Sequence, residues 1–320
     1  MRAIVFDKYG SVDQLRLEEV EKPVPQADEV RIKVCAASVN RIDLQLVQGK
    51  FWYRMRNGLF NPGKATPGID IAGVVDALGP EAIGWMLGQE IYASLANYGF
   101  GGFAEYVCVP KSALALKPKN LSFVESAAVP TTATTAFQGL VDWGQMLSYR
   151  SVLIIGAAGG VGHFAVQMAK NYNLQVTAVS RSENLDFVKS LGADFTLSHE
   201  KMEFLSDERR YELIFDTVGD TSAHKYRKML TGDGKYVVSA FSPSAIVSSP
   251  FGGILNNRKV IVFRVKPDPK DLSTIRKMIE RGSVYPKVDR IYPLEEIKEA
   301  LTYATSGNAR GKVVIQIAES

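Results

Sequence analysis

One stretch of this sequence, SVLIIGAAGGVGHFAVQMAK at positions 151–170, restricts the possible folds more than any other. It places a short apolar strand, a glycine-rich turn and a helix in the order that a dinucleotide-binding βαβ unit requires. Gly159 and Gly160 allow the backbone to approach a pyrophosphate, and Gly162 allows the helix and the strand to pack closely. Ala157 replaces the first glycine of the usual G-x-G-x-x-G pattern, so the glycine turn alone is weak evidence. Its position between a predicted strand and a predicted helix is what favours a nucleotide site. The candidate pyrophosphate contacts are Gly156, Ala158, Gly159, Gly160 and Val161.

The end of the next predicted strand, QVTAV at 175–179, bears on the choice between NAD and NADP. An NAD site carries a carboxylate here to hold the ribose 2′-hydroxyl. This chain instead has Ser180, Arg181 and Ser182. Because arginine binds phosphate through a planar fork, we expect NADP(H), with Ser180 and Arg181 at its 2′-phosphate. The alternative is that Arg181 is a solvated surface residue.

Strands and helices alternate around this motif. Further strands are predicted at 211–216 and 235–239, and helices at 163–171, 183–191 and 222–230. Such alternation is typical of a parallel sheet with crossover helices. Residues 123–140 also read as helix, with Pro130 as an interruption.

The segments on either side of this middle part have different secondary-structure patterns. The first 120 residues contain short strand patterns separated by Gly- and Pro-rich turns, namely at 3–6, 29–36, 71–77, 90–94 and 104–109. They predict a compact antiparallel β domain, a barrel in our interpretation. The tail has helices at 271–280 and 294–304 and a strand at 312–317, and it is too short to be a domain. We therefore expect an α/β protein with a β domain at 1–122, completed by 266–320, and a doubly wound domain at 123–265.

Composition excludes several partners. With 38 basic and 34 acidic residues the net charge is +4, too small a bias to indicate nucleic acid or an anionic membrane. No apolar run approaches the length of a membrane span or a signal sequence. The chain has only two cysteines and three histidines. Two cysteines are too few for a disulfide framework or for a four-cysteine zinc site. We expect a cytoplasmic protein that binds neither nucleic acid nor membrane.

The assembled motifs, in their order, resemble the medium-chain dehydrogenase/reductase superfamily over essentially the whole chain. Within it they are most similar to the zinc-free quinone oxidoreductase branch related to zeta-crystallin. The resemblance implies a GroES-like β-barrel catalytic domain, a Rossmann nucleotide domain and an active site in the cleft between them. It is carried by AASVNRIDLQLVQGKF (36–51), TPGIDIAGVV (66–75), GGFAEYV (101–107), AAVPTTATTAF (127–137), IIGAAGGVG (154–162), FDTVGD (215–220) and GNARGKVVI (307–315).

Zinc-dependent relatives carry cysteine and histidine ligands in matching blocks. Here Asn40 stands near the place of the first cysteine, and Ile69 and Asp70 stand where the relatives have His-Glu. Thr and Ala residues after Pro130 fill the place of the second cysteine. We therefore expect no catalytic or structural metal.

The resemblance also implies cofactor contacts outside the glycine turn. Thr135 matches a threonine on the nicotinamide side, and Val218 is expected near the nicotinamide ribose. Arg310 and Lys312 match a basic pair that faces the cofactor. The alternative for Thr135 is a role in helix packing, and for Val218 it is a plain β-turn. The alternative for Arg310 and Lys312 is a surface charge pair. The residues that end the following strand complete the set, namely Ser239, Ala240 and Phe241.

The implied reaction is hydride transfer from NADPH to a quinone or an α,β-unsaturated carbonyl compound, which needs a hydrogen-bond donor to the acceptor oxygen. Asn40 is the first candidate donor, since it lies in the block that carries a metal ligand in zinc relatives. Asp43, one helical turn on, is expected to orient Asn40 or only to cap the local turn. Tyr53 is a second candidate, for proton donation.

Two other functions stay open at this level. One is a 2-enoyl thioester reductase, which uses the same cofactor geometry. The other is a non-catalytic NADPH-binding protein, because a fold does not guarantee turnover. The apolar segment at 257–265 matches an edge strand that relatives pair across a two-fold axis, so we expect a homodimer.

Overall fold

The computed structural model describes residues 1–201, 208–219, 227–239 and 260–318. The chain divides into two compact units. The first contains Met1–Thr131, Pro267–Glu280 and Pro286–Ser320. The second contains Thr132–Lys266 and Arg281–Tyr285. The division falls inside a helix, later than the expected boundary at 122/123, and the tail contributes mainly to the first unit.

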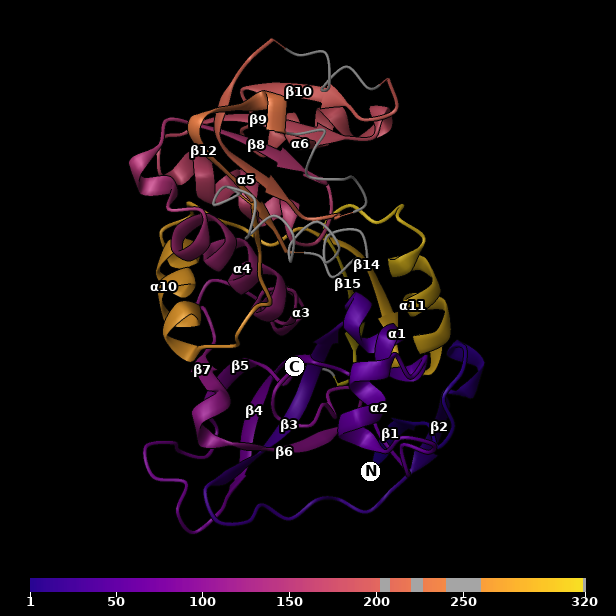
Figure 1. The fold of residues 1–320 in the computed structure, drawn as a ribbon. Coiled ribbons are helices and arrows are strands. Elements are labelled where there is room, and N and C mark those ends of the chain that lie inside the picture. The colour runs from indigo at the N-terminus through magenta and orange to yellow at the C-terminus, as the bar shows by residue number, and fades with distance from the viewer. Residues whose placement is uncertain (202–207, 220–226, 240–259, 319–320) are drawn as a thin grey trace. The chain divides into compact units, whose positions relative to one another are not determined.

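The first unit is built on a seven-stranded sheet in which β14-β15-β3-β4-β5-β7 are neighbours and β6 pairs with β3 (Figure 1). Pairing is antiparallel except between β14 and β15. A separate two-stranded sheet is made by β1 and β2. The strands are β1 (Arg2–Val5), β2 (Arg16–Glu19), β3 (Glu29–Ser38), β4 (Asp70–Leu78), β5 (Glu90–Ser94), β6 (Tyr106–Pro110), β7 (Leu114–Leu116), β14 (Val288–Pro293) and β15 (Lys312–Gln316). The α-helices are α1 (Arg41–Val47), α2 (Phe51–Asn57), α3 (Phe123–Ala127), α10 (Pro269–Glu280) and α11 (Ile297–Thr305), with 3-10 turns at Val12–Gln14, Lys111–Ala113 and Leu294–Glu296.

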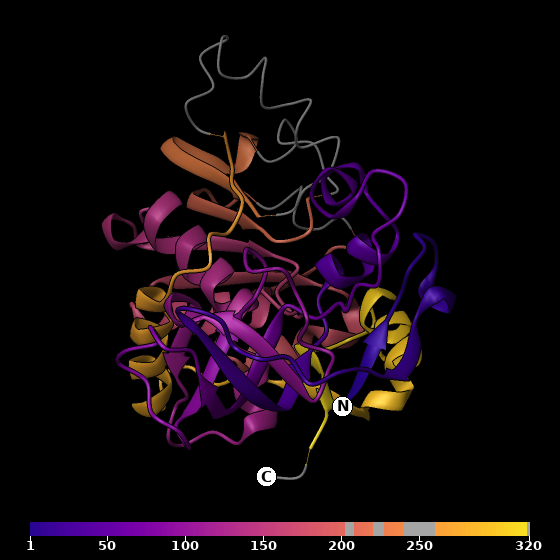
Figure 2. The ribbon, with the colours of Figure 1, turned by 90° about the horizontal axis from the view of Figure 1, so that it is seen from below.

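The C-terminal tail completes the core of this first unit. Ile297 and Leu301 of α11 are buried in one apolar cluster with Leu46 and Val47 of α1. Figures 1 and 2 show α11 beside α1, and β15 pairs antiparallel with β3. Burial of these apolar faces explains why so short a tail folds against a domain that lies far away in sequence.

The second unit holds a six-stranded parallel sheet in the order β10-β9-β8-β11-β12-β13. Numbered along the chain this is 3-2-1-4-5-6, the doubly wound order, and it reverses between β8 and β11. The strands are β8 (Ser151–Ile155), β9 (Gln175–Ser180), β10 (Phe195–Ser198), β11 (Tyr211–Asp216), β12 (Leu230–Val238) and β13 (Val260–Val262). The helices are α4 (Pro130–Phe137), α5 (Gly162–Asn171) and α6 (Leu185–Ser190), with a π-helix at Gln138–Trp143 and 3-10 turns at Met146–Ser148, Ser182–Asn184 and Arg227–Met229.

Pro130 separates two helices where the sequence pattern suggested one interrupted helix. It is the first residue of α4, a position at which proline loses no hydrogen bond because the first amides of a helix have no intrahelical partner. The expected helix at 222–230 lies mostly outside the described residues. Short elements such as α1, α2 and β10 were not predicted, because seven residues or fewer carry little periodic signal.

Candidate functional site

A row of buried polar residues crosses the sheet of the first unit. Asp70 begins β4 and pairs in register with Ser38, the last residue of β3, and with Ser94, the last residue of β5. All three are buried, and the flanking Ile69 and Ile71 are fully buried as well. A carboxylate in such surroundings requires compensating partners.

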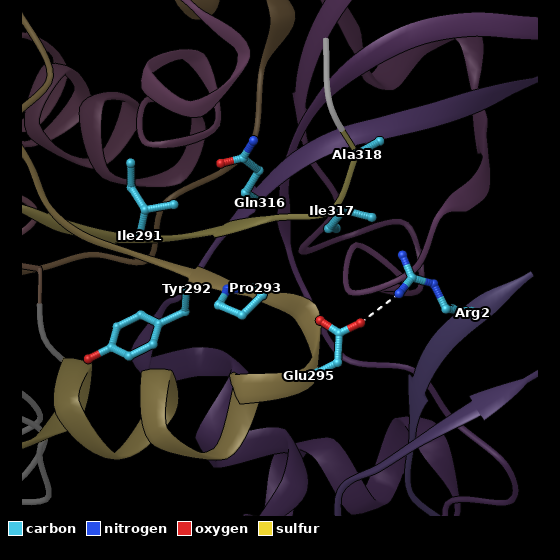
Figure 3. A pocket seen from close by; sticks show the side chains of 8 residues that line it. All are labelled: Arg2, Ile291, Tyr292, Pro293, Glu295, Gln316, Ile317 and Ala318. Atoms are coloured by element: carbon cyan, nitrogen blue, oxygen red, sulfur yellow. Dashed lines mark hydrogen bonds and ion pairs between the residues drawn. The ribbon is translucent and has the colours of Figure 1, made fainter.

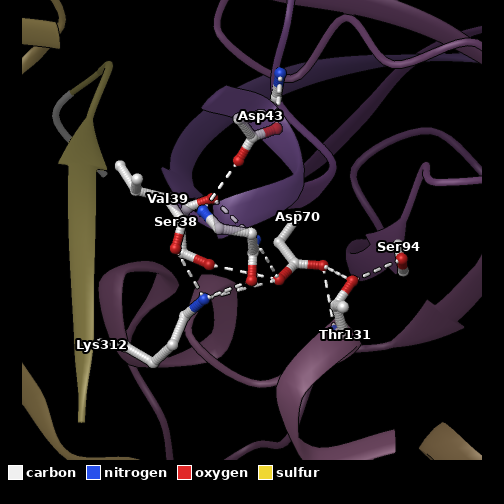
Figure 4. Close-up of polar contacts among 9 residues, drawn as sticks. Ser38, Val39, Asp43, Asp70, Ser94, Thr131 and Lys312 are labelled. Atoms are coloured by element: carbon white, nitrogen blue, oxygen red, sulfur yellow. Dashed lines mark hydrogen bonds and ion pairs between the residues drawn. The ribbon is translucent and has the colours of Figure 1, made fainter. Parts of the chain in front are cut away.

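Asp70 has these partners in full (Figure 4). Its Oδ2 atom accepts hydrogen bonds from Asn40 Nδ2 at 2.9 Å and from Ser38 Oγ at 3.3 Å. Its Oδ1 atom accepts from the backbone amide and the hydroxyl of Thr131, at 3.0 and 2.6 Å. Ser94 Oγ lies 2.7 Å from Thr131 Oγ1 and extends the chain of hydrogen bonds. Asp70 thereby binds Thr131, which belongs to the same unit, to the sheet of the first unit.

Lys312 brings the matching charge into this network. Its side chain is 2% exposed, and its Nζ atom lies 3.9 Å from Asp70 Oδ2. Nζ donates to the backbone carbonyl of Val39 at 2.9 Å and to Asn40 Oδ1 at 2.7 Å. We expected Lys312 to face the cofactor. Its ammonium group instead binds Val39 and Asn40, which belong to the first unit. Arg310, its expected companion, is exposed.

Asn40 is saturated by the same network. Besides Asp70, its Nδ2 atom donates to the carbonyl of Ser38 at 3.2 Å, while Oδ1 accepts from Lys312. Both amide protons are therefore in use, whereas we expected one to face a substrate. The geometry gives Asn40 the role of joining β3, β4 and β15 at one point.

Asp43 supports Asn40 through the backbone. Its carboxylate accepts from the amide of Asn40 at 2.8 Å and from the amide of Gly68 at 3.1 Å. This is the local orientation expected of Asp43, except that it acts on the main chain of Asn40. Burial raises the pKa of Asp43 to about 7.

Charge and burial oppose each other in this network. Burial raises the pKa of Asp70 and lowers that of Lys312, while the proximity of the two charges counteracts both changes. Four donated hydrogen bonds favour the ionised form of Asp70. We conclude that the hydrogen bonds to Asp70 and from Lys312 keep both groups charged. The loss of either partner should then destabilise the fold.

Tyr53, the second candidate donor, lies on α2. It is half-buried and packs edge-on against Phe100, with 6.1 Å between the ring centroids. Its apolar ring is thus held by the core, which leaves its hydroxyl as the polar end of an anchored side chain.

The glycine turn of the second unit has the geometry of a phosphate-binding turn. Gly156 has φ of +76°, and a Cβ atom there would lie 2.5 Å from Thr217 Oγ1. A Cβ atom on Gly162 would lie 2.1 Å from the carbonyl oxygen of Gly156, so close packing requires glycine there. On Gly159 it would meet only that same oxygen, at 3.4 Å. The first turn of α5 contains no acidic residue, so its amides suit a pyrophosphate.

The remaining cofactor candidates of the second unit are distributed along the carboxyl ends of its strands. Val218 and Gly219 follow β11 and donate their amides to Asp216 Oδ1 at 2.8 and 2.9 Å. Ser239 follows β12 and is half-buried, and Thr135 is buried on α4. Ala158 is buried, and Gly160 and Val161 are half-buried. Ala240 and Phe241 lie outside the described residues.

The expected 2′-phosphate site contains a residue that sequence reasoning missed. Ser180 is buried at the end of β9, and Arg181 Nη1 lies 3.9 Å from Glu183 Oε1. Ser182 Oγ donates to Glu200 Oε2 at 2.5 Å. Glu200 is distant in sequence, and only the pairing of β9 with β10 brings it here.

The described residues contain no group of three or more His, Cys, Asp or Glu side chains arranged to hold a metal ion. At the positions of the zinc ligands, Ile69 has no donor atom, and the amide of Asn40 is bound to Asp70 and Lys312. Zinc sites use thiolate and imidazole ligands above all, so these residues do not fit zinc.

A pocket at the edge of the first unit contains none of the predicted site residues (Figure 3). Across it, Arg2 Nη1 and Glu295 Oε1 form an ion pair at 2.6 Å. It is lined by Arg2, Ile291, Tyr292, Pro293, Glu295, Gln316, Ile317 and Ala318.

Known proteins are similar to this chain over nearly its whole length. Residues 26–119 match the family described as "Alcohol dehydrogenase GroES-like domain", and residues 191–315 match "Zinc-binding dehydrogenase". A 2-methylene-furan-3-one reductase of Solanum lycopersicum is 34% identical, over 98% of this chain and 79% of its own length. An NADPH-dependent alkenal/one oxidoreductase of Arabidopsis thaliana is 33% identical with the same coverage. The structure of the quinone oxidoreductase from Coxiella burnetii superposes with a TM-score of 0.90 at 27% identity, covering 99% of both chains.

The expectation of a cytoplasmic protein is wrong by this comparison. The Arabidopsis relative is named as chloroplastic, and so is a quinone-oxidoreductase homolog of Spinacia oleracea. A similar NAD(P)H oxidoreductase of Bos taurus is named as mitochondrial. The relatives thus point to organelles. In the described part of the chain, no helix has the length and apolar character needed to cross a membrane.

Proposed function

The chain belongs to the zinc-free quinone oxidoreductase family of the medium-chain dehydrogenase/reductase superfamily, and from this we propose that it reduces quinones and α,β-unsaturated carbonyl compounds with NADPH. The observation that carries the proposal is the similarity, over 98% of the chain, to reductases named for alkenal/one and furanone substrates. The parallel sheet in the order 3-2-1-4-5-6, with a glycine turn at its switch point, supports the cofactor.

NADPH, when bound, supplies the hydride. We assign its pyrophosphate to the turn at 156–161 and the start of α5, where the open space at Gly159 and the backbone amides suit an anion. Ser180 and Arg181 are assigned to the 2′-phosphate, since Ser180 ends β9 and Arg181 follows it directly. Val218 and Ser239, at the ends of β11 and β12, complete the assignment, with Thr135 on the nicotinamide side and Arg310 as an exposed cation.

The acceptor oxygen gains negative charge as hydride reaches the substrate, so the site needs a hydrogen-bond donor there. Tyr53 is our candidate for that donor, because its anchored ring limits the positions of its hydroxyl. Asn40, Asp43 and Lys312 are assigned as positioning residues, since their polar atoms bind one another and Asp70.

An NADPH-oxidation assay with a set of electrophiles tests the proposal. We expect turnover of a naphthoquinone and a short alkenal above that of a crotonyl thioester. Preference for the thioester would favour a 2-enoyl thioester reductase, and background rates with all of them would favour a non-catalytic NADPH-binding protein. Zinc at one equivalent in the purified protein, or inhibition by a chelator, would contradict the zinc-free assignment.

We also propose a homodimer formed through the edge of the parallel sheet. β13 ends the described strand order, and an apolar edge strand gains from pairing with a second copy. Part of the predicted segment, residues 257–259, lies outside the described residues. Light scattering at micromolar concentration should give twice the chain mass, and the mass of one chain would refute the dimer.

A further inference from the structure

Next to Ser180 and Arg181, the residues assigned to the 2′-phosphate of NADPH, two serines bind a carboxylate of this chain. Glu200 Oε2 accepts from Ser182 Oγ at 2.5 Å, from the Ser182 amide at 3.0 Å and from Ser198 Oγ at 3.4 Å. The two serine hydroxyls are 2.8 Å apart. Glu200 and Ser182 are exposed, so a soluble ligand has access to them, whereas Ser198 is buried.

The sheet explains why these groups meet. β9 and β10 are parallel, and Ser180 pairs in register with Ser198. The segments that follow both strands therefore leave the same edge side by side, which places Ser182 next to Glu200. Parallel sheets bind ligands outside this carboxyl edge.

The bonding pattern is that of an anion site. Three hydrogen bonds converge on one oxygen of Glu200, and the bonds from the side chain and then the backbone of Ser182 lower the pKa of this carboxyl. A phosphate oxygen also accepts charge-assisted hydrogen bonds from such donors. Arg181 precedes Ser182 in the sequence and adds a cation to the same segment.

We propose that Glu200 is a specificity-determining residue that competes with the 2′-phosphate of NADPH for Ser182 and Ser198, and that NADPH displaces it on binding. The proposal rests on the proposed function. Its consequence is that Glu200 weakens the binding of 2′-phosphorylated nucleotides and leaves the binding of nucleotides with a free 2′-hydroxyl nearly unchanged.

The test is nucleotide affinity, measured by isothermal titration calorimetry on the full chain. The probes are NADPH, NADH, adenosine 2′,5′-bisphosphate and 5′-AMP. Glu200→Gln keeps the size of the side chain and removes its charge. We expect its affinity for NADPH and the bisphosphate to rise roughly 3- to 10-fold, as release from an internal competitor predicts, with NADH and 5′-AMP nearly unchanged.

Glu183→Gln is the matched control. It removes the same charge from a neighbouring carboxylate that is 59% exposed and lies 3.9 Å from Arg181. A similar gain in this control would show a general effect of charge and would overturn the proposal. So would unchanged or weaker NADPH binding by a folded Glu200→Gln variant. Loss of NADH affinity alone would instead make Glu200 an acceptor for the ribose 2′-hydroxyl. Absence of any nucleotide binding by the parent chain would refute the proposed function itself.

Discussion

Lys312 Nζ donates a 2.7 Å hydrogen bond to Asn40 Oδ1, across 272 positions of sequence. Through this bond the last strand of the chain supports the segment that joins β3 to α1. Because Asp70 is also bound to Asn40, removal of the lysine leaves a buried carboxylate and two buried acceptors without their cation.

Lys312→Met should therefore destabilise the protein by about 3–5 kcal/mol, since breaking a buried ion pair leaves an uncompensated charge. Urea denaturation measures this change. Lys277→Met, at an exposed position of α10, is the control and should change stability by less than about 0.5 kcal/mol. Equal effects of the two substitutions would show that the Asp70–Lys312 pair contributes nothing particular.

Asp43 should make stability fall as pH rises. Its pKa in the folded protein is about 7, above the ordinary value of 3.8, so the folded state binds this proton more tightly than the unfolded state. The resulting stability is present below pH 3.8 and is lost as pH rises toward 7, at up to about 1.4 kcal/mol per pH unit. Asp43→Asn removes this titrating group. The urea midpoint should therefore fall more between pH 5 and pH 8 in the parent than in the variant. Parallel pH profiles would contradict the assignment.

Gly162→Ala and Gly159→Ala should have different consequences. The Cβ atom at 162 would lie 2.6 Å from Ala157 Cα, so strand and helix must separate and the melting temperature should fall. The Cβ atom at 159 meets no atom closer than 3.4 Å. That variant should keep its melting temperature and lose NADPH affinity, because the methyl group occupies the approach to the pyrophosphate. The reverse pattern would refute the assigned turn.

Arg181→Ala should weaken NADPH much more than NADH. Charge-assisted hydrogen bonds to a phosphate contribute about 1.5–3 kcal/mol, or roughly a 10- to 150-fold increase in the KM for NADPH. Steady-state kinetics with both cofactors measures this. Equal losses with the two cofactors would mean that Arg181 does not recognise the 2′-phosphate.

Tyr53→Phe should lower turnover and leave the KM for NADPH unchanged. Loss of a donor to a developing oxyanion typically reduces kcat roughly 10²- to 10³-fold. Enones should show the larger effect, because quinones are intrinsically more reactive. Phenylalanine retains the ring, so the packing on Phe100 persists. The substitution thus removes the hydroxyl group without removing the contact that anchors the side chain. Unchanged kcat with both substrate classes would eliminate Tyr53 as donor.

Local pattern was enough to predict the parallel-sheet domain. The strand at 151–155, the glycine turn and the helix that follows it are contiguous, and their chemistry depends on backbone conformations that neighbouring residues impose. Gly162 is an example, because its need for a bare Cα follows from a strand and a helix that are adjacent in sequence. Alternation of strands and helices then predicts the parallel pairing, since such crossovers permit little else.

Tertiary structure decided the polar network around Asp70 and the contact between Ser182 and Glu200. Asp70 stands between two isoleucines in the sequence, but nothing local identifies Lys312 as its partner. Lys312 appeared to belong with Arg310, its sequence neighbour, until the pairing of β15 with β3 turned it into the core. Glu200 likewise meets Ser182 only because β9 and β10 end at the same edge. Hydrogen bonds and ion pairs act over a few ångströms of space, so contacts between residues distant in sequence are set by strand register, which local composition does not encode.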